Sequence, residues 1–290
     1  MKHADIIQKL NLEQKCALLS GETVFTTRAL PGKGIPAITL SDGPNGVRKQ
    51  AGAADHLGLN PSVPATCFPT SSATACSWDE KLGEAVGEAL GEEAAAQEVA
   101  VLLGPGLNIQ RSPLCGRDFE YFSEDPILAG RMAAAYVRGI QKNGIAACPK
   151  HFAVNSQELR RMASDSIVDE RTLREIYLTG FEIAVKEGHP RSIMSSYNLV
   201  NGMYANENKH LLMEILRGEW GFDGAVITDW GGSNDHALGV KNGSTLEMPA
   251  PGGDSERELL AAVESGKITE SDIDARLSEL LPLVFDTKAA

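Results

Sequence analysis

Residues 225–232, AVITDWGG, place a carboxylate and an indole directly after a short apolar run. The run is typical of a buried strand, so Asp229 and Trp230 would stand at its carboxyl end, where barrel enzymes present reactive groups. Asp229 could act there in catalysis, and the Trp230 ring would offer an apolar plane to a ring-shaped substrate. An aspartate after a strand can equally be the N-cap of the next helix, so the octet alone leaves both interpretations open.

Other polar side chains follow further β-type runs along the chain. They are Asp42 in SDGP, Arg117 in GRDFEYFSEDP, Lys150 and His151 in PKHF, Arg161 in ELRRM, and Tyr197 in SSYN. Recognition of a sugar ring needs such a mixture, because carboxylates accept hydrogen bonds from hydroxyls while Lys, Arg and His donate to hydroxyl oxygens. We therefore expect these residues to surround Asp229.

The elements that must position these side chains are indicated by alternating β-type and amphipathic helical patterns. Apolar residues recur three and four positions apart in the helices expected at 79–97, 126–142, 170–187, 208–220 and 271–281. Asp125 and Asp169 are expected N-caps, and Pro282 is expected to end the last helix. Strands are expected at 37–40, 99–103, 146–148, 192–195, 225–228 and 245–248.

This alternation indicates parallel βα units. Because the chemically active residues follow the strands, the pattern favours an α/β fold of the TIM-type (β/α)8 barrel, with allowance for irregular first strands. A doubly wound open sheet would give the same alternation and stays open as an alternative. A chain of 290 residues is long enough to bury one large core, so residues 1–290 are expected to form a single barrel domain.

Composition narrows the classes of function. A formal net charge of -12 disfavours a nucleic-acid partner, because phosphate backbones attract basic surfaces. Hydrophobic residues at 42% and charged residues at 23% are typical of a globular chain. The sequence shows neither a signal-peptide pattern nor an apolar stretch long enough to span a bilayer, so we expect no membrane partner and a cytoplasmic protein.

Cysteine and histidine spacing gives no sign of a metal or cofactor. The cysteines are odd in number and show no CxxC pair, so they are expected to be buried thiols of a reducing compartment: Cys16, Cys67, Cys76, Cys115 and Cys148. The remaining histidines lack HExxH or HxH spacing: His3, His56, His189, His210 and His236. We expect neither a bound metal nor a cofactor.

The chain resembles family 3 glycoside hydrolases, specifically the N-terminal barrel domain of bacterial β-glucosidases. Six segments follow that family's order and approximate spacing over nearly the whole chain: SDGPNGVR, GPGLNIQRSPLCGRDFEYFSEDP, KHFAVNSQELRRMASDSIVDER, IMSSYNLVNG, LRGEWGFDGAVITDWGG and LEMP. The resemblance implies a retaining β-glycosidase that hydrolyses terminal non-reducing β-D-glucosyl residues of small glucosides or oligosaccharides.

The same resemblance implies a role for each residue singled out above. Asp229 matches the nucleophile that forms a covalent glycosyl-enzyme, and Trp230 matches the aromatic residue beside it. The residues matching those that hold the sugar in the -1 subsite are Asp42, Arg117, Lys150, His151, Arg161 and Tyr197. If the cations among them lie nearby, they are expected to favour the ionised form of Asp229.

The sequence departs from the family at the second catalytic group. The acid/base is usually a glutamate of an α/β sandwich domain that follows the barrel, and this sequence ends at Ala290. We expect that domain to be absent and turnover to be impaired. Single-barrel β-N-acetylhexosaminidases instead carry a His/Asp dyad after KHFPGHG, but the matching KHFAVNSQELRRMASD holds no second histidine.

Structural interpretations stay open for single residues. Lys150 and His151 could belong to a capped loop, Arg161 could pair with surface carboxylates, and Glu120 is expected to be structural. An alternative function is an isolated barrel that binds sugar or a partner chain without efficient turnover. It would self-associate through the surface that a second domain would cover, around the PAPGG loop and Phe119, Tyr121 and Phe122.

Overall fold

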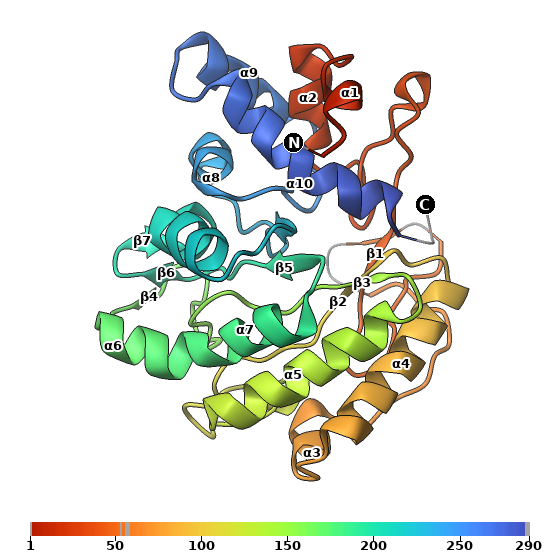
Figure 1. Ribbon diagram of the computed structural model, residues 1–290, viewed down its shortest axis with the longest axis vertical. Coiled ribbons are helices and arrows are strands. Elements are labelled where there is room, and N and C mark those ends of the chain that lie inside the picture. The colour runs from red at the N-terminus through yellow and green to blue at the C-terminus, as the bar shows by residue number, and fades with distance from the viewer. Residues whose placement is uncertain (1, 53, 56–58, 288–290) are drawn as a thin grey trace.

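The computed structural model describes residues 2–52, 54–55 and 59–287. Short strands lie at the centre, and helices pack on them in two groups (Figure 1). One group comprises α3 (Ser71–Ala75), α4 (Glu80–Ala96), α5 (Pro126–Gln141), α6 (Glu170–Thr172) and α7 (Thr179–Ile183). The other comprises α1 (Ala4–Ile7), α2 (Leu12–Leu18), α8 (His236–Asn242), α9 (Asp254–Glu264) and α10 (Glu270–Phe285).

Tighter and wider helical turns complete the helical elements. The 3-10 turns are η1 (Pro31–Lys33), η2 (Asp118–Glu120) and η5 (Ala205–Glu207). The π-type segments are η3 (Leu173–Leu178), η4 (Ala184–Gly188) and η6 (His210–Glu219).

The strands are short and form three small sheets. Parallel strands in the order β1-β2-β3 make the first: β1 (Leu40–Asp42), β2 (Val101–Leu103) and β3 (Ala146–Ala147). A parallel pair makes the second: β5 (Ser192–Met194) and β8 (Ala225–Ile227). The third contains β4 (Asp165–Ser166), β6 (Leu199–Val200) and β7 (Met203–Tyr204), with β6 and β7 antiparallel.

The closed eight-stranded barrel expected from the sequence is not found among the described residues, which form a mixed α/β fold with small sheets. Isolated parallel bridges continue the series of segments, joining Phe152 to Ser195, Ile227 to Leu246 and Ser20 to Glu247. Regular pairing ends early because Pro105 and Pro149, close behind β2 and β3, carry no backbone N–H to donate. The strand expected at 245–248 is reduced to the bridges at Leu246 and Glu247.

The expected helices are found with small differences at their ends. Segments 79–97 and 126–142 correspond to α4 and α5, segment 170–187 to the run from α6 to η4, and segment 208–220 to η6. Asp125 and Asp169 are N-caps as predicted. The expected stop at Pro282 is wrong, because α10 continues to Phe285. Burial of Leu283 and Val284 past the proline outweighs the backbone hydrogen bond that Pro282 cannot make.

Alternating side chains of the central strands enter two hydrophobic cores. Leu102 and Val226 belong to the core that includes residues of α4, α5 and α7, whereas Val101 and Ile227 belong to the core that includes residues of α2, α9 and α10. Successive side chains of a strand point to opposite faces, so even strands of three residues contribute to both cores.

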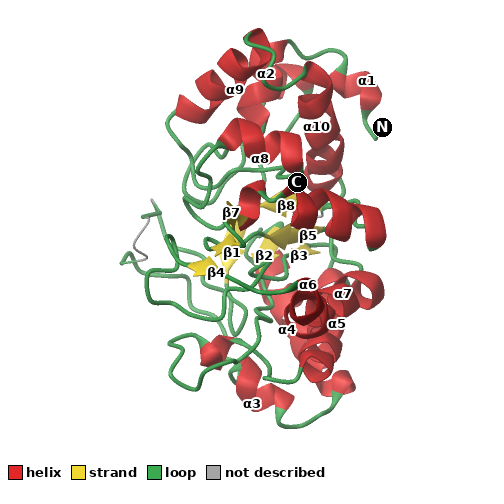
Figure 2. Cartoon of the chain, turned by 90° about the vertical axis from the view of Figure 1, so that its left-hand side faces the viewer, coloured by secondary structure: helices red, strands yellow, loops and turns green. Residues whose placement is uncertain are grey.

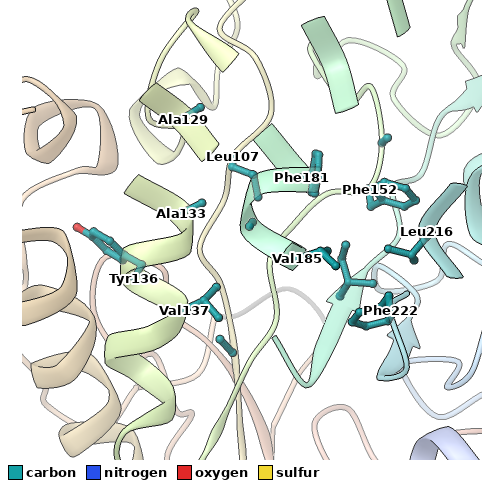
Figure 3. Packing of buried hydrophobic residues seen from close by; sticks show 14 of the residues in the cluster. Leu107, Ala129, Ala133, Tyr136, Val137, Phe152, Phe181, Val185, Leu216 and Phe222 are labelled. Atoms are coloured by element: carbon teal, nitrogen blue, oxygen red, sulfur yellow. The ribbon is translucent and has the colours of Figure 1, made fainter. Parts of the chain in front are cut away.

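The first core also holds part of the loop that follows β3. Figure 3 shows Phe152 between Phe181 of α7 and Leu216 of η6. The Phe152 ring meets the Phe181 ring edge-on with centroids 5.3 Å apart, and the Trp220 ring in the same manner at 5.8 Å. This packing anchors the segment immediately after Lys150 and His151.

Glycines allow α4 and α5 to approach closely, as the two helices run side by side in Figure 1. Gly83, Gly87 and Gly91 recur every four residues and therefore share one face of α4. A Cβ added at Gly87 would lie 2.5 Å from the carbonyl oxygen of Tyr136 in α5. The absence of side chains on this face thus sets the distance between the helices.

Thiol burial differs from the expectation for three of the cysteines. Cys16 and Cys148 are buried as predicted, and burial raises the pKa of the Cys148 thiol to about 12. Cys67 and Cys76 are exposed and Cys115 is half-buried; none of the three side chains belongs to either core, although Ala75, next to Cys76, does.

None of the described helices has the length and apolar character needed to cross a membrane. Figure 2 shows that most of the loops extend from the strands to one side of the molecule, away from α4, α5 and α7.

Candidate active site

A cavity of about 270 Å³ opens where the carboxyl ends of the central strands meet these loops. All eight site residues expected from the sequence line it: Asp42, Arg117, Lys150, His151, Arg161, Tyr197, Asp229 and Trp230. The structure therefore brings the predicted residues together, and their chemical roles stay predictions.

Parallel pairing explains why residues so distant in sequence converge. Asp42 is the last residue of β1, Tyr197 follows β5, and Asp229 follows β8. Because strands paired in parallel end on the same side, their carboxyl ends present these side chains to one cavity. Arg117 and Arg161 reach the cavity from the longer loops after β2 and β3.

Asp229 lies at the cavity with one carboxylate oxygen held and the other available. Its Oδ1 accepts a hydrogen bond from the Trp230 backbone N–H at 2.8 Å. Among the described residues its Oδ2 has no hydrogen-bond partner, and the His151 Nε2 lies 3.7 Å away. Burial raises the pKa of Asp229, although Lys150, the Trp230 N–H and Arg117 act to lower it. The cations favour the ionised carboxylate as expected, but burial outweighs them.

A buried carboxylate organises two of the cations. Glu120 lies 2.7 Å from the Nε of Arg117 and 3.2 Å from the Nζ of Lys150. Burial alone would raise the pKa of Glu120, but Lys150 and Arg117 outweigh burial and hold it at about 2. The Nζ of Lys150 also lies 3.4 Å from the Oδ1 of Asp42. Glu120 is thus an internal counter-ion, in line with its expected structural role.

Lys150 and Arg117 stay charged in spite of their burial. Burial alone would lower the pKa of Lys150, but Glu120 and Asp42 outweigh it and raise that pKa. Burial would likewise lower the pKa of Arg117, whereas the neighbouring Tyr121 and Glu120 raise it. The cavity therefore presents fixed positive charge beside Asp229.

His151 is a neutral residue in this site. Its side chain is 1% exposed, and burial together with Arg117 and Lys150 lowers its pKa well below the ordinary value. The Nη2 of Arg117 lies 3.0 Å from the Nε2 of His151. Because a guanidinium can only donate, Nε2 is the acceptor of this hydrogen bond. The expectation that His151 donates to a hydroxyl is therefore not met at Nε2.

Arg161 and Tyr197 form a stacked wall of the cavity. The Arg161 guanidinium lies over the Tyr197 ring, 4.7 Å from its centroid, and its Nη1 is 2.6 Å from the Oε2 of Glu158. The Tyr197 hydroxyl donates to the Trp230 carbonyl at 2.7 Å. Burial, followed by the charge of Asp229, raises the pKa of Tyr197, so its hydroxyl remains a donor.

An aromatic pair lines the side of the cavity near residue 24. The indole Nε1 of Trp230 donates to the Val24 carbonyl at 2.8 Å, and the Phe25 ring centroid lies 5.3 Å from that of Trp230. Trp230 therefore has its polar edge satisfied by the protein. Its ring is left to provide apolar surface.

Sequence reasoning missed six residues that line the cavity: Val24, Phe25, Arg48, Gln50, Asp55 and Met194. Arg48 lies in the SDGPNGVR motif and Met194 directly precedes SSYN, so both residues could have been proposed from these motifs. No apolar strand pattern precedes Val24 and Phe25, so the sequence did not indicate that they line the cavity. The Asp55 carboxylate accepts from the backbone N–H groups of Leu59 and Asn60.

The apolar surface expected around residues 119–122 is mostly absent. Phe119 is 54% exposed, but Tyr121 and Phe122 are buried at 0% and 2%. The Tyr121 hydroxyl lies 3.2 Å from the Nδ1 of His151, and the Phe122 ring packs against Tyr136. These aromatic residues support the site and the core.

The described part of the chain contains no group of three or more His, Cys, Asp or Glu residues arranged to hold a metal ion.

Comparison with known proteins places this geometry in a family. Residues 53–283 match the glycosyl hydrolase family 3 N terminal domain. Thermostable beta-glucosidase B from Acetivibrio thermocellus is 50% identical over 280 residues, which cover 97% of this chain and 37% of that protein. An exo-alpha-(1->6)-L-arabinopyranosidase from Bifidobacterium longum is 44% identical over 285 residues, covering 98% of this chain and 37% of that protein.

The fold has close structural relatives as well. The structure of beta-glucosidase 3B from Thermotoga neapolitana in complex with glucose matches with a TM-score of 0.92 at 40% identity, over 98% of this chain and 42% of that one. The chain thus spans less than half the length of each of these relatives. Because the family match extends over most of its residues, the chain belongs to glycosyl hydrolase family 3 and corresponds to the N-terminal domain of that family.

Proposed function

We propose that this chain is the nucleophile-bearing domain of a retaining β-glycosidase that acts on terminal non-reducing β-D-glucosyl residues. The observation that carries the proposal is Asp229, whose Oδ2 has no hydrogen-bond partner among the described residues and lies in a cavity lined by fixed cations. Nucleophilic attack by a carboxylate requires an oxygen whose lone pairs are not already taken up by hydrogen-bond donors.

The proposed reaction has two steps. Asp229 attacks the anomeric carbon, the bond to the leaving oxygen breaks, and a covalent glycosyl-enzyme forms. Water then attacks the same carbon, the ester to Asp229 breaks, and the sugar is released with retained configuration. An acid/base group protonates the leaving oxygen in the first step and deprotonates water in the second.

Binding of the sugar is assigned to the other cavity residues. Lys150, Arg117 and Arg161 offer donors to ring hydroxyls, Asp42 offers an acceptor, and Trp230 offers an apolar face. A cavity of about 270 Å³ is at the small end for ligand pockets, which suits one terminal ring. Glucose in the Thermotoga neapolitana structure supports a glucosyl unit as the sugar that this chain binds. Because another relative is an arabinopyranosidase, a pentopyranoside is the substrate with which a glucoside should be compared.

A second candidate function, sugar binding without efficient turnover, is favoured by the state of the other carboxylates. Asp42 pairs with Lys150, Glu120 pairs with two cations, and Asp55 accepts from two backbone N–H groups. All three described carboxylates are therefore engaged by cations or by backbone N–H groups. In our proposal residues 1–290 form one domain, and the acid/base group comes from outside the described residues.

The first experiment is trapping with a 2-fluoro-glucoside that carries an activated leaving group, followed by intact-mass spectrometry and peptide mapping. We expect one glycosyl group on the peptide containing Asp229. Asp229→Asn should abolish the adduct, whereas Asp223→Asn, at an exposed aspartate paired with Lys2, should leave it unchanged. An adduct on another residue would remove Asp229 from its role.

Two further measurements separate the candidate functions. A folded chain that binds glucose in calorimetry but gives no adduct would support binding without turnover. Loss of a general acid commonly costs about 100- to 10,000-fold, and activated aryl glucosides suffer least because their leaving groups need little protonation. Equal efficiency on cellobiose and on an activated aryl glucoside would show that the acid is already present in this chain.

A further inference from the structure

Asn108 is a buried residue behind the cavity that none of the catalytic assignments uses. It follows β2 in the segment GPGLN and is 2% exposed. Its Nδ2 donates to the His151 carbonyl at 2.9 Å, and its Oδ1 accepts from the His151 backbone N–H at 2.8 Å. The same Oδ1 lies 3.3 Å from the imidazole Nδ1 of His151. One amide side chain therefore contacts three polar atoms of His151.

These contacts fix the orientation of the Asn108 amide. A backbone N–H can only donate and a backbone carbonyl can only accept, so the two main-chain contacts determine which end of the amide carries oxygen. The oxygen consequently faces the Nδ1 of His151. An oxygen cannot donate, so Nδ1 must carry the hydrogen of this contact.

Arg117 favours the same tautomer from the other side of the ring. Its guanidinium points a donor at Nε2 at 3.0 Å, so Nε2 must present a lone pair. Tyr121, at 0% exposure, places its hydroxyl 3.2 Å from Nδ1 and meets the imidazole edge-on, which fixes the plane of the ring. Arg117 thus assigns Nε2 as an acceptor and Asn108 assigns Nδ1 as a donor, whereas the Tyr121 hydroxyl can donate or accept and fits either tautomer.

We propose that Asn108 is a positioning residue that holds His151 as the neutral Nδ1–H tautomer, so that Nε2 presents a hydrogen-bond acceptor to the cavity. This inference rests on the proposed function for its consequence, because a hydroxyl of the bound sugar would share with Arg117, or take from it, the single lone pair of Nε2. Among cationic donors and carboxylates, His151 is then an uncharged acceptor that selects a donating hydroxyl.

The tautomer also protects the nucleophile. The Nε2 of His151 lies 3.7 Å from the Oδ2 of Asp229. A hydrogen on Nε2 would face the donors of Arg117 and would be drawn to Oδ2, the oxygen that must attack. With the hydrogen on Nδ1, where Asn108 accepts it, Oδ2 keeps its lone pairs for the anomeric carbon.

The test is NMR of the chain labelled with ¹⁵N-histidine, which reads the tautomer without any substrate. The His151 signals are assigned by their loss in His151→Gln. We expect a protonated Nδ1 and an unprotonated Nε2 in the parent chain and in Asn108→Asp, whose carboxylate still accepts. In Asn108→Leu, where Arg117 alone still favours the Nδ1–H tautomer, we expect a larger Nε2–H population than in the parent chain. Asn108→Ser serves the same purpose if the leucine variant does not fold.

The matched control is Asn206→Leu. Asn206 is also buried, but it accepts from the Ser195 and Ser244 hydroxyls and makes no contact with His151, so the His151 tautomer should not change. An Nε2–H tautomer in the parent chain, or an unchanged Nδ1–H tautomer in the leucine and serine variants of Asn108, would overturn the inference.

Trapping kinetics connect the tautomer to chemistry. The rate of adduct formation with the 2-fluoro-glucoside should fall about tenfold in Asn108→Leu, the equivalent of one hydrogen bond, and recover in Asn108→Asp. If the parent chain shows the Nδ1–H tautomer but forms no adduct, the proposed function fails while the inference stands. If it forms the adduct with an Nε2–H tautomer, the inference fails alone.

Discussion

At the scale of single residues, Asp229 combines two opposing requirements. The end of β8 that presents it also buries it, and burial raises the pKa of its carboxyl group. Retaining catalysis needs the ionised form, and Lys150 is the strongest of the groups that favour it. The buried ammonium and the buried carboxylate are therefore functionally linked.

Lys150→Met should move the acidic limb of the trapping rate to higher pH. The rate rises as Asp229 ionises, so in the parent chain this limb lies above the ordinary aspartate value of 3.8, in line with the raised pKa. Removing the Lys150 charge raises that pKa further, and the maximal rate should fall about 100-fold through the lost charge. The pH dependence of adduct formation measures both effects.

Lys186→Met is the control for this experiment, because Lys186 pairs with Glu182 on the surface, four residues away on the same helical segment. Its pH profile should match that of the parent chain. A limb that stays in place in Lys150→Met, or moves to lower pH, would contradict the assignment of Lys150 as the stabilising cation.

The sequence predicts which residues form the site better than it predicts their pKa values and hydrogen-bonding roles. The identity of residues such as Asp42, Tyr197 and Asp229 follows from motifs after strands, and the structure gathers all of them. The direction of the Asp229 pKa shift and the acceptor role of the His151 Nε2 were not predictable, because both depend on burial and on contacts between distant segments. Phe25 was missed for the same reason.

At the scale of elements, the sequence predicts the pairing of helices better than the pairing of strands. The helices α4 and α5 follow from local periodicity, and their close contact follows from the glycines spaced four residues apart in GEAVGEALG. Strands of two or three residues carry too little pattern to predict their pairing, and closure of a barrel depends on contacts that no local pattern contains. The helices were therefore predicted well and the sheet arrangement was not.

Gly87→Ala should destabilise the chain by about 1–3 kcal/mol, because the new Cβ would overlap the backbone of Tyr136, which cannot rotate away. The gain in helix propensity, about 1 kcal/mol at most, offsets part of this cost. Urea unfolding measures the change in the free energy of unfolding. Gly32→Ala is the control, because a Cβ there meets no atom within 4 Å. Equal stability of the two variants would disprove close packing of α4 on α5.

Glu279→Ala should loosen α10 from the rest of the fold. The Glu279 carboxylate lies 2.8 Å from Arg217 of η6 and 2.7 Å from Arg276, and it accepts from the Thr245 hydroxyl. Burial lowers the pKa of Arg217 to about 10, which shows how little water reaches this cluster. Removing one partner of a buried ion pair costs about 3–5 kcal/mol, because the remaining charges are left without compensation.

Urea unfolding of Glu279→Ala is compared with that of Glu264→Ala, an exposed glutamate of α9. The control should change the free energy of unfolding by less than about 0.5 kcal/mol. A loss in Glu279→Ala no larger than that of the control would mean that α10 is held by its apolar face alone.

At the scale of the whole molecule, the loops around the cavity expose apolar side chains at the surface. The loops that carry Arg117 and Arg161 also carry exposed apolar side chains, among them Leu114 at 93% and Leu159 at 78% exposure. Exposed apolar side chains of this size favour association when they come together on one face. Leu114 and Leu159 are thus exposed in place of the expected Tyr121 and Phe122. Leu114 lies on the same loop as these aromatic residues, and Leu159 lies on the loop after β3.

We expect the chain to self-associate with rising concentration through these loops. Replacing both Leu114 and Leu159 by lysine should shift the chain toward monomer in analytical ultracentrifugation, because buried apolar area is lost and charge is added. Leu82→Lys, at an exposed leucine of α4, should leave the association unchanged. A parent chain that stays monomeric at all concentrations would rule out this surface as a contact.

Trp230 gives the cavity an optical reporter of its own. It is one of three tryptophans in the chain, and it alone among them lines the cavity. Trp220 is buried in a core and Trp78 is exposed at the surface, so their emission forms a constant background. A ring that enters the cavity displaces water from one indole whose N–H is already held by the Val24 carbonyl. Occupancy can therefore be followed as a change in intrinsic fluorescence, with no label attached and no bond broken.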